Sequence, residues 1–259
     1  MSNDYNDFKN RPLVSVVMNC FNGERYLKEA IDSVFNQTYT NWEIIFWDNN
    51  SADKSSSIAN SYGEKLIYYK APTFTPLYEA RNLAIDKCQG KVIAFLDVDD
   101  IWLPDKLERQ MSLISSNNRI IYGGYEDIDR NGDRTGVVQD SCPSGFITSQ
   151  LLLKNISQGS VLIDALLLKE YKFDERYHII GDFDLWVRLS FSHKFKSIDG
   201  TVELSRQHDS NESNTKRYKW LSDRRYFYCK FLKSKSFLKY PKILLYIFKT
   251  ELKGLIGLR

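Results

Sequence analysis

The sequence contains no long hydrophobic run. Its longest uninterrupted apolar stretch, Ile243 to Phe248, has six residues, whereas a helix that spans a bilayer needs about 20. The first twelve residues are polar and carry mixed charge, so they lack the apolar centre of a secretory signal. We therefore expect neither a membrane-spanning helix nor a secretory leader.

Cysteines are few and scattered. The four of them, Cys20, Cys88, Cys142 and Cys229, show neither the spacing of a metal site nor the density of a disulfide framework. Their distribution predicts a protein of the reducing cytoplasm. The 259 residues are 42% hydrophobic and 27% charged, which is typical of a soluble globular protein.

Positive charge is concentrated at the C-terminal end. Residues 215–259 contain 13 lysines and arginines and two acidic residues, a net charge of +11, although the whole chain carries only +3. The other 214 residues therefore carry −8. This division predicts an acidic body with a basic arm that binds an anionic partner.

The first half of the chain alternates between short apolar runs and helical patterns. Runs typical of buried strands cover 14–18, 42–47, 66–69 and 92–96. Helical patterns follow at 24–36, after Ser51 or Asp53 and after Pro76, and Pro104 stands where a further helix would begin. Such repeated units predict a mostly parallel sheet covered by helices on both faces.

Beyond about residue 119 the alternation becomes less regular. We expect a strand at 120–122, a hairpin-type turn at 129–136, a helix at 182–191 and a strand at 202–205. Residues 216–259 are helical in pattern, and Pro241 divides them. The irregular half would supply the second wall of a site.

Polar residues follow three of the expected strands. Asn19, Asp48 and Asp97 stand at strand ends, where open parallel sheets bind ligands. Asp97, Asp99 and Asp100 place three carboxylates within four residues, and these repel one another unless a cation or hydrogen-bond donors balance them. A helix N-cap formed by Asp99 or Asp100 is the structural alternative, but a cap requires only one carboxylate.

Several segments, in order along the chain, resemble the opening of family-2 glycosyltransferases. They are SVVMNCFN (15–22), ERYLKEAIDSVFNQT (24–38), WEIIFWDNNSAD (42–53), ARN (80–82) and IAFLDVDDIWLPDKL (93–107). A weaker match runs through FDERYHIIGDFDLWVRL (173–189) and RQHDSNES (206–213). The resemblance is close from 13 to about 110, loose over 155–213, and absent from the tail.

The resemblance implies an α/β architecture of the GT-A type, with a Rossmann-like, mostly parallel central sheet. It also implies inverting transfer of a sugar from a nucleotide-diphosphate sugar with a divalent cation, Mn²⁺ or Mg²⁺. Residues 13–214 would form the transferase domain, with a nucleotide-sugar-binding half (13–118) and an acceptor-side half (119–214). Residues 1–12 would be a polar extension and 215–259 a basic, amphipathic helical tail.

The same resemblance assigns a nucleotide site. Asn19 and Phe21 would form part of the floor of the base pocket, and Asp48 would accept a hydrogen bond from the base. Arg81 would lie along the nucleotide. For Asp48 the alternative is an Asx-type turn with Ser51, and for Arg81 it is an ordinary solvated or ion-paired helix residue.

Other residues would hold the diphosphate and the sugars. By resemblance, Asp97 would contact the ribose or sugar, Asp99 would bind the metal that bridges the phosphates, and His208 would lie near that metal. Trp102 and Trp186 could stack on an acceptor sugar, although aromatic residues at helical spacing more often belong to the core.

The resemblance also assigns the general base. The family places an acidic pair before an aromatic-rich helix, and Asp182 falls on its second member, whereas Gly181 replaces the commoner Glu. Burial beside Phe183 and Trp186 could bring the pKa of Asp182 towards the operating pH. The alternatives are that Asp182 only caps this helix, or that Asp184 is the base, although it would face away.

Two other functions remain open on the sequence. Asp-x-Asp after an apolar strand also occurs in haloacid-dehalogenase phosphatases, but there it follows the first strand and a Thr or Val comes two residues later. Here the motif follows the fourth expected strand. A non-catalytic sugar-nucleotide or carbohydrate-binding protein on a transferase scaffold is the second alternative, which Gly181 favours.

The basic tail predicts a location and partners. Between 237 and 256, apolar residues alternate with lysines, a pattern that lies in membrane interfaces and is drawn to anionic lipids. We expect a peripheral protein on the inner face of the cell membrane, acting on a glycan or lipid-linked acceptor of polysaccharide, lipopolysaccharide or capsule biosynthesis. The apolar stripe could instead pack on the body or on a second copy in a homodimer. No recognition module for nucleic acid accompanies the charge.

Overall fold

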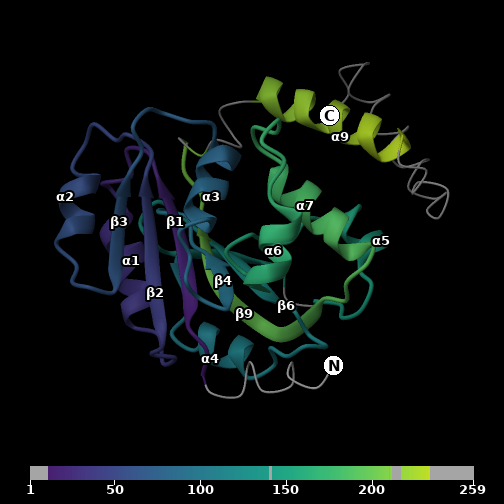
Figure 1. The fold of residues 1–259 in the computed structure, drawn as a ribbon, viewed down its shortest axis with the longest axis horizontal. Coiled ribbons are helices and arrows are strands. Elements are labelled where there is room, and N and C mark those ends of the chain that lie inside the picture. The colour runs from purple at the N-terminus through teal and green to yellow at the C-terminus, as the bar shows by residue number, and fades with distance from the viewer. Residues whose placement is uncertain (1–10, 140–141, 210, 212–216, 234–259) are drawn as a thin grey trace.

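The structure is a computed structural model of the chain, and it describes residues 11–139, 142–209, 211 and 217–233. One mixed sheet runs through the molecule, with the strand order β3-β2-β1-β4-β8-β6-β9-β5 and with β7 paired to β6 (Figure 1). The predicted strand–helix alternation is confirmed in the first half.

The first half forms the parallel part of the sheet. β1 pairs in parallel with β2 and β4, and β2 pairs in parallel with β3. The carboxyl ends of these strands therefore lie along one edge. The elements are β1 (Val14–Cys20), α1 (Leu27–Phe35), β2 (Trp42–Asp48), α2 (Ser55–Asn60), β3 (Leu66–Lys70), α3 (Leu77–Ile85) and β4 (Val92–Phe95).

The second half adds antiparallel strands that the sequence did not reveal. β8 lies antiparallel between β4 and β6, β9 runs parallel to β6, and the two-residue β5 pairs antiparallel with β9. The hairpin turn expected at 129–136 is confirmed, because β6 and β7 pair antiparallel around it. The elements are β5 (Ile101–Trp102), α4 (Lys106–Met111), β6 (Ile120–Ile128), β7 (Arg134–Gln139), α5 (Thr148–Leu151), β8 (Leu162–Asp164), α6 (Ala165–Tyr171), α7 (Gly181–Ser190), β9 (Lys196–Arg206) and α9 (Arg217–Lys233).

Two hydrophobic cores cover the two faces of the sheet. Successive side chains of a strand point to opposite faces, so Val16 and Met18 of β1 pack with α1, α2 and α4, whereas Val17 packs with α3 and α7. Both faces of the sheet are therefore covered by apolar side chains, as the apolar runs predicted.

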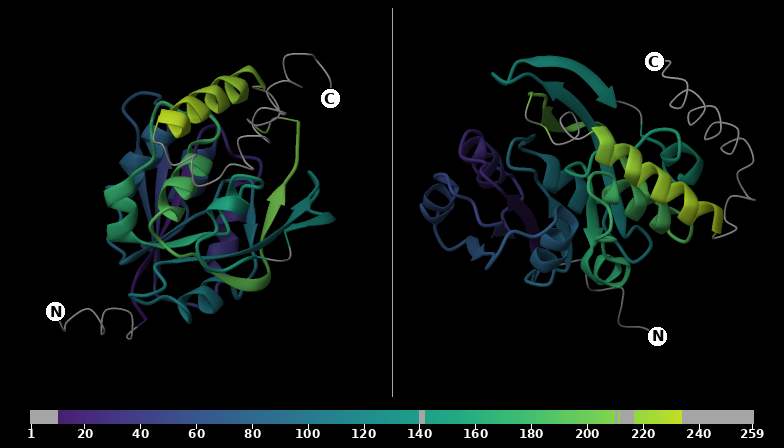
Figure 2. Two further views of the ribbon diagram at one scale, coloured as in Figure 1. Left: turned by 90° about the vertical axis from the view of Figure 1, so that its right-hand side faces the viewer. Right: turned by 90° about the horizontal axis from the view of Figure 1, so that it is seen from above.

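Helix α9 lies across α7 on the second core (Figures 1 and 2). Phe227 and Phe231 of α9 are buried there. The ring of Phe227 contacts Phe183 of α7, and the ring of Phe231 contacts Phe191, the residue that follows α7. The first part of the predicted tail thus packs against the body. The apolar and lysine-rich pattern at 237–256 lies outside the described residues.

None of the helices in the described part of the chain has the length and hydrophobicity needed to cross a bilayer.

Candidate active site

Three strand ends bring the predicted polar residues to one edge of the sheet. Asn19 pairs with Trp47 in the β1–β2 register, and the next pair joins Cys20 to Asp48. Asp97 follows β4, the neighbour of β1 on its other side. The sheet therefore places Asn19, Asp48 and Asp97 on adjacent strands, as parallel pairing requires.

The three aspartates of the loop after β4 have different environments. The side chain of Asp97 is 50% exposed and receives a hydrogen bond from Arg81 Nη2 at 2.8 Å. The side chain of Asp99 is 25% exposed and lies 2.9 Å from His208 Nε2. Asp100 is buried and accepts the backbone N–H of Arg206 at 2.7 Å. Asp97 and Asp99 are thus open to a ligand, whereas Asp100 anchors β9.

The N-cap alternative for this loop is wrong. β5 follows the aspartates, and α4 begins only at Lys106, with Asp105 as its N-cap residue and no side-chain cap. Neither Asp99 nor Asp100 caps a helix, so their clustering has another cause.

Asp99 and His208 come together as a pair that suits a divalent cation. Burial raises the pKa of Asp99, repulsion from Asp97 raises it further, and His208 opposes both. A cation would relieve this repulsion. Among the described residues, no group of three or more His, Cys, Asp or Glu side chains could hold a metal ion by itself.

Arg206 supports the acidic loop, a role that the sequence did not indicate. Its guanidinium is buried, donates to the Asp99 carbonyl at 2.9 Å and to Glu29 at 2.6 Å, and lies over the Tyr26 ring. Tyr26 in turn stacks on His208, with ring centroids 5.3 Å apart. The only available signal was a basic residue two positions before the histidine.

Two buried titratable residues lie near the loop. Glu203 of β9 and Lys106 of α4 are both fully buried. Burial raises the pKa of Glu203 to about 7 and lowers the pKa of Lys106 to about 7. Glu203 also raises the pKa of Asp100, after burial itself. Neither carboxylate oxygen of Glu203 has a hydrogen-bond partner among the described residues, and Lys106 Nζ donates to Gln110 at 2.6 Å.

Two exposed phenylalanines flank the end of β1. Phe21 is 54% exposed and Phe74 is 58% exposed, and their rings meet edge to face at 4.9 Å. The buried Nδ2 of Asn19 has no hydrogen-bond partner among the described residues. Apolar surface beside an unpaired donor suits a nucleobase, and Phe74 is a member of this group that the sequence did not indicate.

Asp48 forms the turn that was considered as the alternative to base binding. Its carboxylate is buried, accepts the N–H of Ser51 at 2.8 Å through Oδ1 and accepts the Tyr68 hydroxyl at 2.6 Å through Oδ2. Each carboxylate oxygen can accept more than one hydrogen bond, so the turn does not prevent a further contact.

Asp182 lies in the first turn of α7. Tyr78 Oη is 3.3 Å from its Oδ1, and Asn155 Nδ2 donates to Oδ2 at 3.0 Å. Burial raises the pKa of Asp182, and the positive charge of Arg81 opposes that rise. Because Ile180 is the N-cap residue of α7 and has no side-chain cap, the interpretation of Asp182 as a mere cap is wrong.

Arg81 interacts with Asp182 and with Asp97 of the acidic loop. It is buried, hydrogen-bonds Asp97, and interacts electrostatically with both Asp97 and Asp182. The ion-paired alternative for Arg81 is thus realised inside the site. Arg81 thus links Asp182, a carboxyl of raised pKa, to the acidic loop.

A profile described as "Glycosyl transferase family 2" matches residues 15–171. The chain belongs to this family.

Curated relatives agree with this membership. The chain is 33% identical over 191 residues to "UDP-Glc:alpha-D-GlcNAc-diphosphoundecaprenol beta-1,3-glucosyltransferase WfgD" of Escherichia coli, covering 72% of this chain and 73% of WfgD. It is 34% identical over 214 residues to an uncharacterized glycosyltransferase of Rickettsia typhi, covering 79% and 67%. The match to a longer relative from Rickettsia bellii covers 27% of the length of that relative.

Solved structures show the same GT-A fold. TarS 1–349 of S. aureus in complex with UDP-GlcNAc superposes with a TM-score of 0.65 at 19% identity, over 78% of this chain and 60% of that one. The mannosyltransferase PcManGT of Pyrobaculum calidifontis, in complex with GDP-Man and Mn²⁺, gives 0.62 at 14% identity, over 90% and 68%. The predicted fold is confirmed, and a haloacid-dehalogenase phosphatase is excluded as the family.

The structure gives a steric reason for glycine at position 181, directly before Asp182. A Cβ atom at Gly181 would lie 2.6 Å from the Tyr78 ring, which is far inside contact distance. Tyr78 is itself buried, and its hydroxyl donates to the Ile179 carbonyl at 2.6 Å. The tyrosine therefore occupies the space that the first acidic side chain of the commoner pair would need.

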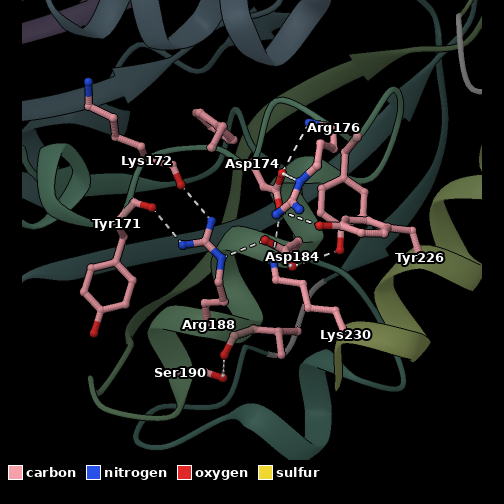
Figure 3. Close-up of polar contacts among 12 residues, drawn as sticks. Tyr171, Lys172, Asp174, Arg176, Asp184, Arg188, Ser190, Tyr226 and Lys230 are labelled. Carbon is pink, nitrogen blue, oxygen red and sulfur yellow. Dashed lines mark hydrogen bonds and ion pairs between the residues drawn. The ribbon is translucent and has the colours of Figure 1, made fainter. Parts of the chain in front are cut away.

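Asp184, the rival base, belongs to a structural network of this transferase-family chain (Figure 3). Its buried carboxylate receives Arg188 Nε at 2.7 Å, Lys230 Nζ at 2.9 Å and the Tyr177 hydroxyl at 3.0 Å. Two cationic side chains and a hydroxyl thus bind Asp184 where α7 packs against α9. Asp184 therefore ties helices together and does not face the acidic loop's side of Asp182.

The two tryptophans expected at the acceptor are core residues. Trp102 is buried and its Nε1 donates to the Gly159 carbonyl at 3.0 Å. Trp186 is fully buried in the core beneath α7. Both rings are packed within the protein core, so the expectation that they stack on a sugar is wrong for this structure.

Proposed function

We propose that the protein transfers a sugar from a nucleotide-diphosphate sugar to an acceptor hydroxyl with inversion. The observation that carries the proposal is that the buried Arg81 interacts with both Asp182 and Asp97 of the acidic loop, so that the two acidic groups belong to one site. Asp182 offers a base of raised pKa, and the acidic loop offers carboxylates suited to a cation and a diphosphate.

In the chemical step, Asp182 accepts the proton of the acceptor hydroxyl, and the oxygen of that hydroxyl attacks the anomeric carbon. The bond from that carbon to the diphosphate oxygen breaks, and the nucleoside diphosphate leaves with the bonding electrons. A single displacement of this kind inverts the anomeric centre. Tyr78 and Asn155 orient the carboxylate of Asp182, which is how a general base is kept in reach of its proton.

The donor binds along the edge formed by β1, β2 and β4. Phe21 and Asn19 contact the base, and Asp48 accepts a hydrogen bond from it. Asp97 contacts the ribose or the sugar, and Arg81 holds Asp97 in place through their 2.8 Å hydrogen bond. The relatives TarS and PcManGT were solved with UDP-GlcNAc and GDP-Man, which supports a nucleotide sugar as the donor class.

Asp99 and His208 are the residues that would hold a divalent cation, Mn²⁺ or Mg²⁺. The raised pKa of Asp99 and its proximity to Asp97 are the features that such a charge would relieve. When bound, the cation would stabilise the charge that develops on the leaving diphosphate. Arg206 fixes the loop through the Asp99 carbonyl.

The acceptor is a lipid-linked glycan of surface-polysaccharide biosynthesis. The name of WfgD states a diphosphoundecaprenol-linked acceptor, and residues 215–259 of this chain carry +11. A basic, amphipathic segment suits an anionic membrane surface, so we place the protein at the inner face of the cell membrane. Packing of that segment on a second copy is the competing arrangement.

A donor screen tests the function. Binding of UDP-, GDP-, dTDP- and CMP-sugars is measured with and without Mn²⁺, followed by transfer to an acceptor panel. Asp99→Ala should lose the metal-dependent part of binding, whereas Asp182→Asn should bind donor normally and lose transfer. Full transfer by Asp182→Asn would remove the base assignment. Tight donor binding by the wild type without turnover would favour the non-catalytic alternative.

A further inference from the structure

Helix α9 contributes one buried carboxylate to the segment before Asp182. Asp223 is the only acidic residue in α9, among six lysines and arginines, and its side chain is 3% exposed. An acid buried on a basic helix needs partners that compensate the loss of water.

Those partners are the three backbone N–H groups that lead into α7. Asp223 Oδ2 accepts the N–H of His178 at 2.8 Å, of Ile179 at 2.7 Å and of Ile180 at 3.2 Å. Its Oδ1 lies 3.1 Å from His178 Nδ1. One carboxylate of α9 thus binds the whole approach to the helix that carries Asp182.

The same segment is held from its other side by Tyr78. Its hydroxyl donates to the Ile179 carbonyl and lies within 3.3 Å of Asp182. The residue that caps α7, Ile180, makes no side-chain cap of its own. The backbone N–H groups of residues 178–180 therefore donate to Asp223, and the carbonyl of Ile179 accepts its hydrogen bond from Tyr78.

We infer that Asp223 is a positioning residue for the general base: α9 fixes segment 178–180, and through it the first turn of α7 and Asp182. The inference rests on the proposed role of Asp182. It extends the active site to α9, because Asp223 acts on the approach to Asp182, 41 residues away in sequence, through backbone N–H groups and a contact with His178 Nδ1.

Asp223→Ala tests this inference in the full-length chain. We expect kcat for sugar transfer to fall by about 10- to 100-fold, since displacing a catalytic group by about 1 Å costs on the order of 100-fold. The KM for the donor should stay unchanged, because the donor residues lie on β1, β2 and β4 and the loop after β4. Amide hydrogen exchange at 178–180 should accelerate.

Asp223→Asn and Lys230→Met are the matched controls. Asn keeps one oxygen at the position of Oδ2 and should restore most of kcat. Lys230 also joins α9 to the body, through Asp174 and Asp184, but each acid keeps an arginine when it is removed. Lys230→Met should therefore retain both kcat and slow exchange at 178–180.

Each outcome decides the inference. Unchanged kcat and exchange in Asp223→Ala would overturn it, and so would equal losses in Lys230→Met, which would indicate general docking of α9. If Asp223→Ala does not fold, Asp223→Ser replaces it, because its shorter side chain does not span three N–H groups. If the wild type transfers no sugar, the proposed function fails, while the exchange comparison still decides whether Asp223 holds the segment.

Discussion

Replacement of Gly181 by alanine tests whether the Tyr78 ring sets the position of Asp182. On helix propensity alone, alanine would stabilise α7 by about 1 kcal/mol relative to glycine. The structure predicts the opposite sign. The added Cβ would lie 2.6 to 2.7 Å from three ring carbons of Tyr78, so the ring or the helix must move by about 1 Å to reach ordinary contact distance.

The magnitude follows from what this movement disturbs. Overpacking a core costs about 1–3 kcal/mol. A shift of the ring also stretches the 2.6 Å hydrogen bond from Tyr78 to the Ile179 carbonyl, and a buried group left unpaired costs about 1–3 kcal/mol. After subtracting the gain in propensity, we expect Gly181→Ala to lower the free energy of unfolding by about 1–5 kcal/mol.

Urea unfolding and steady-state kinetics measure the effect. Because Tyr78 lies against Asp182, kcat should also fall by about 10- to 100-fold. In a Tyr78→Val background the ring is absent, and Gly181→Ala should become neutral or stabilising, so that the coupling free energy is at least as large as the loss in the wild type. Wild-type stability and activity in Gly181→Ala, or the same loss in both backgrounds, would refute the steric argument.

Three further predictions concern the charged groups. Activity should decline as the pH falls through the raised pKa of Asp182, so the acid limb of kcat should lie above about pH 4 and vanish in Asp182→Asn. Glu203 has its folded pKa raised to about 7 and Lys106 has its folded pKa lowered to about 7. Stability should therefore fall as pH rises towards 7, where Glu203 ionises, and rise again above it, where Lys106 is neutral. Urea unfolding across this pH range measures the effect, and Glu203→Gln should remove the fall below pH 7. The full-length protein should sediment with anionic vesicles at low salt and lose this binding at high salt, and failure to sediment would remove the membrane assignment of 215–259.

Much of the parallel half could be predicted from the sequence. β1, β2 and β4 are apolar runs buried on both faces, and their period and flanking turns are local properties. The acidic residues at their ends follow from topology, because parallel strands place their carboxyl ends together. The second half was harder. β5 and β8 have two and three residues, too few to show a period, and they exist through pairing with distant strands.

The neighbours of the base could not be predicted for a similar reason. Tyr78 and Asn155 reach Asp182 from segments 104 and 27 residues away, and no local pattern marks either one. For the two tryptophans, the sequence predicted a binding role that the structure does not support. Trp102 and Trp186 look suited to stacking on a sugar, but only tertiary packing reveals that both are buried.

The seat of α9 has a practical consequence for work with shortened versions of the protein. The family match stops at residue 171, and a cut near 214 would look harmless on an alignment. It would uncover the rings of Phe183 and Phe191 that Phe227 and Phe231 cover, and such newly wetted aromatic surface promotes aggregation. Expression trials should therefore retain the chain at least to Lys233.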